Sequence, residues 1–168
     1  MLQLLSRVAR RMIGLADRLG WLAPLLMRLY FGYFWAETGW GKLQNLDAFA
    51  QRFAGWGIPH PMVSAALSAY TEWIGGLLIM FGLATRVVCI PMIFNMIVAI
   101  ATVTWAGVHS LDDFAEMDEA LYMFIFFWLM MAGPGRASLD YLIARVVGFN
   151  SEGSRLTSNR IAALASKK

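Results

Sequence analysis

Four long stretches of the chain are almost continuously apolar, and short polar or charged segments separate them. These stretches cover residues 21–41, 62–83, 86–107 and 118–132. A transmembrane helix needs about 20 predominantly apolar residues, so the first three are long enough to cross a bilayer. The fourth is shorter and is expected to begin, with its acidic residues, at interface depth. The pattern predicts an all-α integral membrane protein with a bundle of four transmembrane helices.

The first 20 residues have a different pattern, in which apolar and basic positions follow a helical period. One face carries apolar side chains and the other carries most of the arginines; the two sets are Leu5, Val8, Met12, Leu15 and Leu19, and Arg7, Arg10, Arg11 and Arg18. This predicts a basic amphipathic helix over residues 1–20 that lies on a membrane surface; the alternative is a frayed basic tail. No long apolar core or small-residue cleavage site follows the arginines, so a secretory signal is not expected.

The connections between the apolar stretches also carry local signals. In segment 42–61, an apolar stripe predicts a short interfacial helix capped by Asn45 or Asp47, and Pro61 suits the first turn of the next helix. Ser110 is expected to cap a short turn in the acidic segment 108–118. A second amphipathic segment is expected from Ser138. The polar, basic segment 150–168 is expected to be disordered, which leaves residues 21–149 as the transmembrane domain.

Composition and charge agree with a membrane protein. The 168 residues suit one domain, and they are 59% hydrophobic and 15% charged, against about 45–50% and 25% in soluble domains. The net charge of +3 is modest and the basic residues gather near the chain ends, which favours a lipid surface over nucleic acid as partner. A single cysteine, Cys89, excludes a disulfide within the chain.

The distribution of Lys and Arg predicts the orientation. With four spans, one side of the membrane would carry most of the basic residues and the other side only Lys42 and Arg52. Cytoplasmic loops are enriched in Lys and Arg. Both termini are therefore expected in the cytoplasm, and the protein is expected to be a multi-pass protein of a bacterial inner membrane.

Polar side chains inside the spans are the first candidates for a functional site. A charge at the bilayer centre costs about 2.5–3.5 kcal/mol on insertion scales, so it usually faces the bundle interior and has a partner. Counted from the cytoplasmic ends of their spans, Arg28 and Glu72 differ in depth by about 7 Å, and Asn95 lies near the same level. We expect a buried Arg28–Glu72 pair with Asn95 nearby. It either fixes helix register or forms a polar pocket that holds a quinone headgroup or relays a proton.

A second polar group is expected near the outer face. It contains Glu37 and Lys42 from the first span and Glu119 and Tyr122 from the fourth. Glu37 and Lys42 are five residues apart, which is a poor pairing distance on a helix, so the partner of either is expected to be Glu119 or a loop group. The alternative is that all four are interfacial residues in contact with water.

Aromatic and sulfur-containing residues leave two further kinds of site to consider, a quinone site and a copper site. Trp35, Trp40, Tyr70 and Trp73 could line a quinone site, or they could anchor the protein at the membrane interface. The 11 methionines and two histidines raise the hypothesis of a copper site. Met92 and Met96 are one turn apart, and His60 and His109 are expected to face outward. No ligand set with metal-binding spacing accompanies them, so no metal site is predicted.

Several segments in a fixed order resemble the DoxX family of small bacterial inner-membrane proteins. Over residues 25–142 these are RLYFGYFWAETGWGKL, which begins at Arg28, then GIPHP, EWIGGLLIMFGLATR and GPGRASLD. The resemblance implies a four-helix inner-membrane bundle associated with quinone-linked redox work. Relatives include a subunit of thiosulfate:quinone oxidoreductase, membrane partners in oxidative-stress or small-thiol pathways, and neighbours of systems for copper-binding modified peptides.

Together these observations predict a membrane component of a quinone-linked redox or oxidative-stress and detoxification system. A quinone is the candidate cofactor, and a soluble or membrane oxidoreductase is the candidate partner. Whether the chain catalyses a reaction itself stays open. The alternatives are a non-catalytic scaffold or assembly partner, and an accessory protein of a copper or modified-peptide system. An exporter ranks last, because the spans carry isolated charges rather than a continuous polar stripe.

Overall fold

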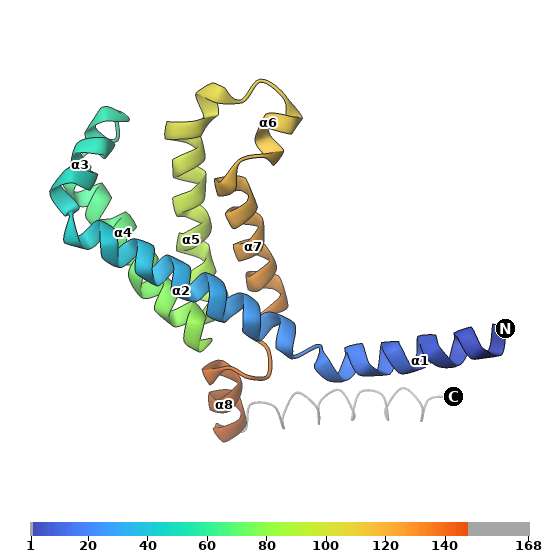
Figure 1. Cartoon of the computed structure of the whole chain (residues 1–168). Coiled ribbons are helices and arrows are strands. Elements are labelled where there is room, and N and C mark those ends of the chain that lie inside the picture. Colours follow the sequence, from blue (N-terminus) through green and yellow to red (C-terminus); the bar gives the residue numbers. More distant parts are fainter. Residues whose placement is uncertain (1, 148–168) are drawn as a thin grey trace, which may run out of the picture.

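The computed structural model describes residues 2–147, and every regular element in this range is helical, which confirms the all-α class. Figure 1 shows the longer helices gathered in a bundle, from which α1 projects to one side. The tail 150–168 lies outside the described residues. The elements are α1 (Leu2–Leu19), α2 (Leu22–Gln44), α3 (Leu46–Gly55), α4 (Pro61–Phe81), α5 (Thr85–Ala99), a π-helical turn (Ile100–Thr104), a 3-10 turn (Trp105–Gly107), α6 (Leu111–Ala115), α7 (Asp118–Ala132) and α8 (Leu139–Val146).

Within residues 2–147, two helical segments are long and apolar enough to cross a membrane, namely Pro61–Phe81 and Thr85–Thr104. The other two expected spans are less regular. Helix α2 has 23 residues but carries Arg28, Glu37 and Lys42. Helix α7 has 15 residues, so it is about 22 Å long, against about 30 Å for a hydrocarbon core. The four-span bundle and the position of both termini in the cytoplasm therefore stay predictions.

Helices α2 and α4 pack against each other in an antiparallel sense through glycines. A Cβ placed on Gly76 would lie 2.7 Å from the carbonyl oxygen of Gly32, and a Cβ on Gly39 would lie 2.7 Å from that of Ala69. Such distances leave no room for a side chain, so the two backbones are in direct contact, as small residues allow between helices. Gly32 also faces Met80, and Gly39 faces Trp73, which sets the register of the pair.

An apolar core fills the space between α2, α4, α5 and α7. Helix α5 lies beside α7 (Figure 1), and side chains from all four helices meet there. Cys89 and Met92 are fully buried in this core. The complete set of buried members is Trp35, Ile79, Val88, Cys89, Met92, Met96, Phe126 and Leu129. A smaller core joins α3 to the first half of α4 through Phe49, Ala50, Phe53, Ala65 and Ala69.

The end of the bundle near α8 is closed by hydrogen bonds between segments far apart in the sequence. The carboxylate of Asp140 accepts hydrogen bonds from the backbone N–H groups of Ala84 (2.8 Å) and Thr85 (3.2 Å), where α5 begins. The backbone N–H of Asp140 in turn donates to the carbonyl of Gly82 at 3.0 Å. These bonds hold α8 against the turn between α4 and α5.

Most of the local signals in the connections are confirmed. Helix α4 begins at Pro61, the Ser110 hydroxyl accepts the Asp113 N–H at the start of α6, and the Ser138 hydroxyl does the same for Tyr141 at the start of α8. Asn45, one of the two predicted caps of α3, is the N-cap residue of that helix, but its side chain makes no capping hydrogen bond.

Candidate functional site: a cavity around Lys42 and Glu72

A buried ion pair joins α2 to α4 in the interior of the bundle. Lys42 Nζ lies 2.6 Å from each of the two carboxylate oxygens of Glu72. The Glu72 side chain is 2% exposed, whereas 28% of the Lys42 side chain remains accessible. A buried carboxylate requires such a partner, because an unpaired charge in this environment is very costly. The geometry therefore accounts for how the chain keeps an acidic residue inside an apolar helix.

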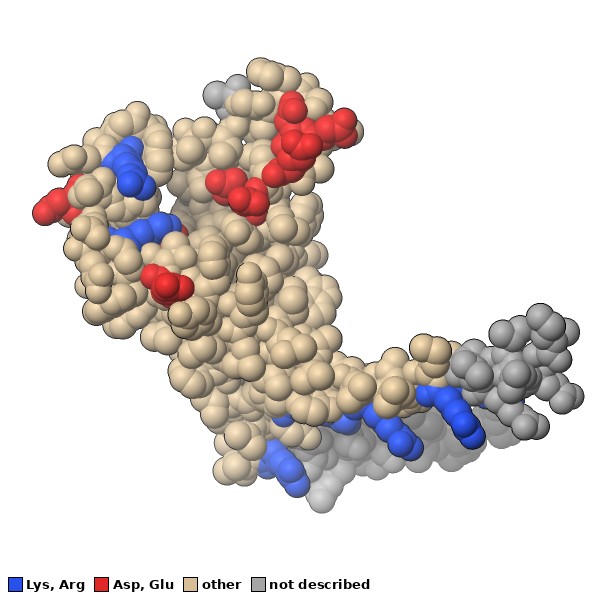
Figure 2. Space-filling view, viewed as in Figure 1, with Lys and Arg blue, Asp and Glu red and all other residues tan. Residues whose placement is uncertain are grey.

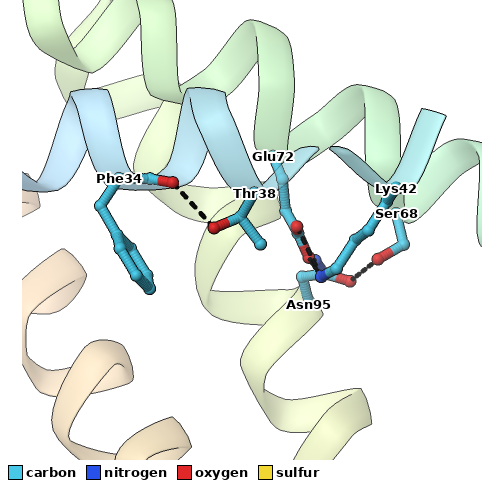
Figure 3. Close-up of polar contacts among 6 residues, drawn as sticks. All are labelled: Phe34, Thr38, Lys42, Ser68, Glu72 and Asn95. Carbon is cyan, nitrogen blue, oxygen red and sulfur yellow. Dashed lines mark hydrogen bonds and ion pairs between the residues drawn. The ribbon is translucent and has the colours of Figure 1, made fainter. Parts of the chain in front are cut away.

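Two neutral side chains extend this pair into a hydrogen-bonded chain. The amide nitrogen of Asn95, on α5, donates to Glu72 Oε1 at 3.0 Å, and the Ser68 hydroxyl donates to Asn95 Oδ1 at 2.9 Å. Figure 3 shows the four side chains converging from α2, α4 and α5. The Lys42 ammonium group has three N–H donors and gives two of them to Glu72, which leaves one for another group.

The pair lies in the wall of a cavity of about 340 Å³. Side chains from α2, α3, α4, α5 and α7 line it, with aromatic rings from Trp35, Phe53, Trp56 and Tyr122. Figure 2 shows the molecular surface hollowed between the side that carries α3 and the side that carries α6 and α7. Small-molecule sites are concave, mostly apolar, contain a few polar groups and measure about 300–1,000 Å³. This cavity has those properties.

The charges in the cavity wall are balanced. Lys42 and Arg52 contribute two positive charges from α2 and α3, and Glu72 and Glu119 contribute two negative charges from α4 and α7. Glu72 and Lys42 neutralise each other. Neither Arg52 nor Glu119 belongs to an ion pair within residues 2–147. Arg52 and Glu119 are therefore the two charged groups of the cavity wall without an ion-pair partner in that part of the chain.

Trp35 contributes a polar atom that is not satisfied. The residue is 5% exposed, lines the cavity and packs edge-on against the ring of Tyr122, with 5.3 Å between ring centroids. Its indole Nε1 is buried and has no hydrogen-bond partner in the described part of the chain. Most buried polar groups in native proteins are hydrogen-bonded. The Trp35 indole N–H is therefore a donor without a partner in the described part of the chain, on a residue that lines the cavity.

The expected pairing of Arg28 with Glu72 was wrong. Arg28 is 1% exposed, and its Nη2 donates to the carbonyl of Ala137 at 2.5 Å near α8, while Glu72 binds Lys42. The α2–α4 register explains the difference: continued from Gly32 opposite Met80, it puts Arg28 level with Ala84. That level is 12 residues from Glu72, or about 18 Å along a helix. Asn95, by contrast, does lie against Glu72.

The expected outer group is only partly brought together. Lys42, Glu119 and Tyr122 all line the cavity, but the partner of Lys42 is Glu72 rather than Glu119 or a loop group. Glu37 is exposed on another face of α2 and does not line the cavity. Two further lining residues, Arg52 and Ser68, were not proposed as site residues. Ser68 could have been found, because it precedes Glu72 by one helical turn on the same face.

Comparisons with known proteins find one matching family model and two relatives. The family model described as DoxX matches residues 23–105. A protein of Bacillus subtilis named "Putative oxidoreductase CatD" is 38% identical over 82 residues, which are 49% of this chain and 60% of that protein. The chain thus spans less than two thirds of that relative. The Mycobacterium tuberculosis membrane protein Rv3486 is 28% identical over 137 residues, 72% of this chain and 81% of its own length. No solved structure matches this chain.

Proposed function

Since residues 23–105 match the DoxX model, this chain is a DoxX-family membrane protein, and we propose that it serves a redox system by binding a quinone headgroup in the cavity at Lys42. The observation that carries the proposal is the free donor capacity at that point. Lys42 is held in place by Glu72 but remains partly accessible. A quinone carbonyl is an uncharged acceptor of the kind that such a donor binds.

Each part of the cavity has a distinct role in this proposal. Lys42 donates to one carbonyl oxygen, and the orphaned Trp35 Nε1 is a second donor after a small adjustment. Glu72 and Asn95 do not touch the ligand: they position the ammonium group. The rings of Phe53, Trp56 and Tyr122 provide faces against which a flat headgroup stacks.

The source of electrons must lie outside this cavity. When bound, a quinone accepts two electrons and two protons. Cys89 is the one cysteine of the chain and is fully buried in the apolar core, where it does not line the cavity. We therefore assign the electron supply to a soluble or membrane oxidoreductase. The name of the Bacillus subtilis relative supports a redox setting for this family, and the inner membrane is the expected location.

Quinone binding can be measured directly on the purified full-length protein. Native mass spectrometry would show whether a quinone co-purifies, and titration with a short-chain quinone analogue would quench the fluorescence of Trp35 and Trp56. Hydrogen bonds to charged groups contribute about 1.5–3 kcal/mol. Lys42→Met should therefore weaken binding by about tenfold or more, and Trp35→Phe should weaken it to a smaller extent, because it removes only the indole donor.

A matched control separates the cavity from the rest of the protein. Glu37→Gln changes a carboxylate on the same helix as Lys42 but on an exposed face, so it should leave quinone affinity unchanged. Glu72→Gln should weaken binding, because the ammonium group loses its anchor. If a folded protein binds no quinone, or if all four variants bind equally, the proposal fails. Recovery of a stoichiometric protein partner without a quinone would instead favour the scaffold function.

A further inference from the structure

The cavity is built from the parts of the helices that lie at one end of the bundle. Arg52 comes from the second half of α3, and Trp56 directly follows that helix. Thr102 and Val103 come from the turn that follows α5, and Glu119 comes from the first turn of α7. Figure 1 places α3 and α6 at this end, and α1 and α8 at the opposite end. Access from water therefore leads in between α3 and the α6–α7 segment, where the surface is hollowed (Figure 2).

Two layers of the structure close the path for protons from the α1/α8 end of the bundle to the cavity. Next to the cavity, the apolar core of α2, α4, α5 and α7 is tightly filled: Ile79, Met92, Phe126 and Leu129 each have no exposed surface. Beyond it, Arg28 binds the carbonyl of Ala137, and Asp140 closes the turn between α4 and α5. A proton needs water or titratable side chains to move, and close-packed aliphatic and aromatic groups provide neither.

We propose that the Lys42–Glu72 pair exchanges protons only with the α3/α6 end of the bundle, and that Glu119 relays them. The titratable groups around the cavity are Lys42 of α2, Arg52 of α3, Glu72 of α4, and Glu119 and Tyr122 of α7; α5 contributes the neutral Asn95. Arg52 cannot release its proton at ordinary pH, and Glu72 is held by hydrogen bonds from Lys42 and Asn95. Glu119 is half-buried and outside any ion pair in the described chain, so it is the carboxylate free to carry a proton.

This inference rests on the proposed function for its chemical role. Two-electron reduction of a quinone consumes two protons, and the electrons come from the partner oxidoreductase. Lys42 gives one proton to the carbonyl oxygen that it binds, and a proton passed from water by Glu119 restores the ammonium group. The other carbonyl oxygen takes its proton from water that enters the cavity through the same opening. Both protons are thus taken from the side of the membrane that α3 and α6 face.

One-sided access can be tested with single cysteines, and that test does not depend on quinone binding. Cys89 is fully buried and should not react with the reagent. The wild-type protein therefore gives the background level of labelling. Ala99→Cys places a thiol in the cavity wall. Leu111→Cys on α6 and Val146→Cys on α8 mark the two ends, since both residues are more than four-fifths exposed.

A membrane-impermeant maleimide is added to sealed vesicles of known orientation. Ala99→Cys should be labelled from the same side as Leu111→Cys and be protected on the side that labels Val146→Cys. Labelling from the Val146 side, or from both sides, would overturn the proposal. If Leu111→Cys is labelled and Ala99→Cys is labelled from neither side, the proposal is overturned as well, because the cavity is then closed to water.

The relay is tested by Glu119→Gln with Glu116→Gln as its matched control, since Glu116 is exposed and outside the cavity. Bound short-chain quinone is reduced with dithionite in a stopped-flow instrument at mildly alkaline pH, where water is a poor proton source. General acid–base groups contribute about 10²–10⁴-fold. Glu119→Gln should slow reduction at least tenfold without changing quinone affinity, and Glu116→Gln should not slow it.

Equal rates of reduction in both variants would remove Glu119 from the proton route. If the wild-type protein and both variants all fail to bind the quinone, the proposed function fails instead.

Discussion

Lys42 Nζ and the two carboxylate oxygens of Glu72 form a symmetric contact, 2.6 Å on each side, that ties the last turn of α2 to the middle of α4. Removing one partner of a buried pair typically costs about 3–5 kcal/mol, because the remaining charge is left uncompensated. Lys42→Met should lower the free energy of unfolding by about that amount. Thermal and denaturant unfolding in detergent would measure it.

The double variant gives the control for this prediction. Lys42→Met combined with Glu72→Met replaces both charges by apolar groups, and it should recover most of the lost stability. Arg52→Met, which removes an exposed cation from the same cavity, should change stability by less than about 0.5 kcal/mol. A double variant as unstable as the single one would show that the pair is not the cause.

The contact between α2 and α4 should be intolerant of a single methyl group. A Cβ on Gly76 would meet backbone atoms of Gly32 and Ala36, none of which can rotate away. Gly76→Ala should therefore force the helices apart and cost about 1–3 kcal/mol. Gly41→Ala, on α2 where a Cβ meets nothing within 4 Å, should cost nothing. Similar melting temperatures for the two variants would contradict the close packing.

Asp140 should contribute to the stability of the fold through the cap that it provides. Its carboxylate satisfies two backbone N–H groups at the start of α5, and loss of a helix cap costs about 0.5–2 kcal/mol. Asp140→Ala should lower stability by about that amount and should increase hydrogen exchange at Ala84 and Thr85. Asp17→Ala, a change at an exposed aspartate of α1, should do neither.

The cap of α6 should weaken at low pH. Hydrogen bonds from the backbone N–H of His109 and from Ser110 lower the pKa of the Asp113 carboxyl. A carboxyl with a lowered folded-state pKa stabilises above its unfolded value, and this contribution disappears as the pH falls through the folded value. NMR titration should show α6 fraying in that acidic range. Asp113→Asn should abolish the pH dependence, and Asp112→Asn should keep it; equal behaviour would contradict the assignment.

The sequence predicted where each helix begins better than it predicted how far one helix is shifted along its neighbour. Hydrophobic periodicity, Pro61, Ser110 and Ser138 placed the helix starts within a residue or two, because these signals are local. Periodicity also put Glu72 and Asn95 on interior faces, and the structure does join them. The four-span arrangement, the orientation of the termini and the interfacial helix over residues 1–20 remain predictions.

The error about Arg28 has a general physical cause. A sequence shows which face of a helix a residue occupies, but the sliding of one helix along another depends on how the two surfaces fit. Here the glycine contacts between α2 and α4 fix that position and bring Lys42, not Arg28, to the level of Glu72. Lys42 was expected near the outer interface because α2 was assumed to end at residue 41, and it continues to Gln44.

Helix α6 stands apart from the bundle in a way that bears on how a ligand enters and leaves. It has five residues, none of them buried, and its capping box is made by its own residues Ser110 and Asp113. Segments with few buried contacts open locally at a small fraction of the global unfolding free energy. Residues beside the cavity entrance can therefore melt and re-form while the four long helices stay packed. Exchange of a bound molecule would then be limited by a brief local opening rather than by separation of the packed helices.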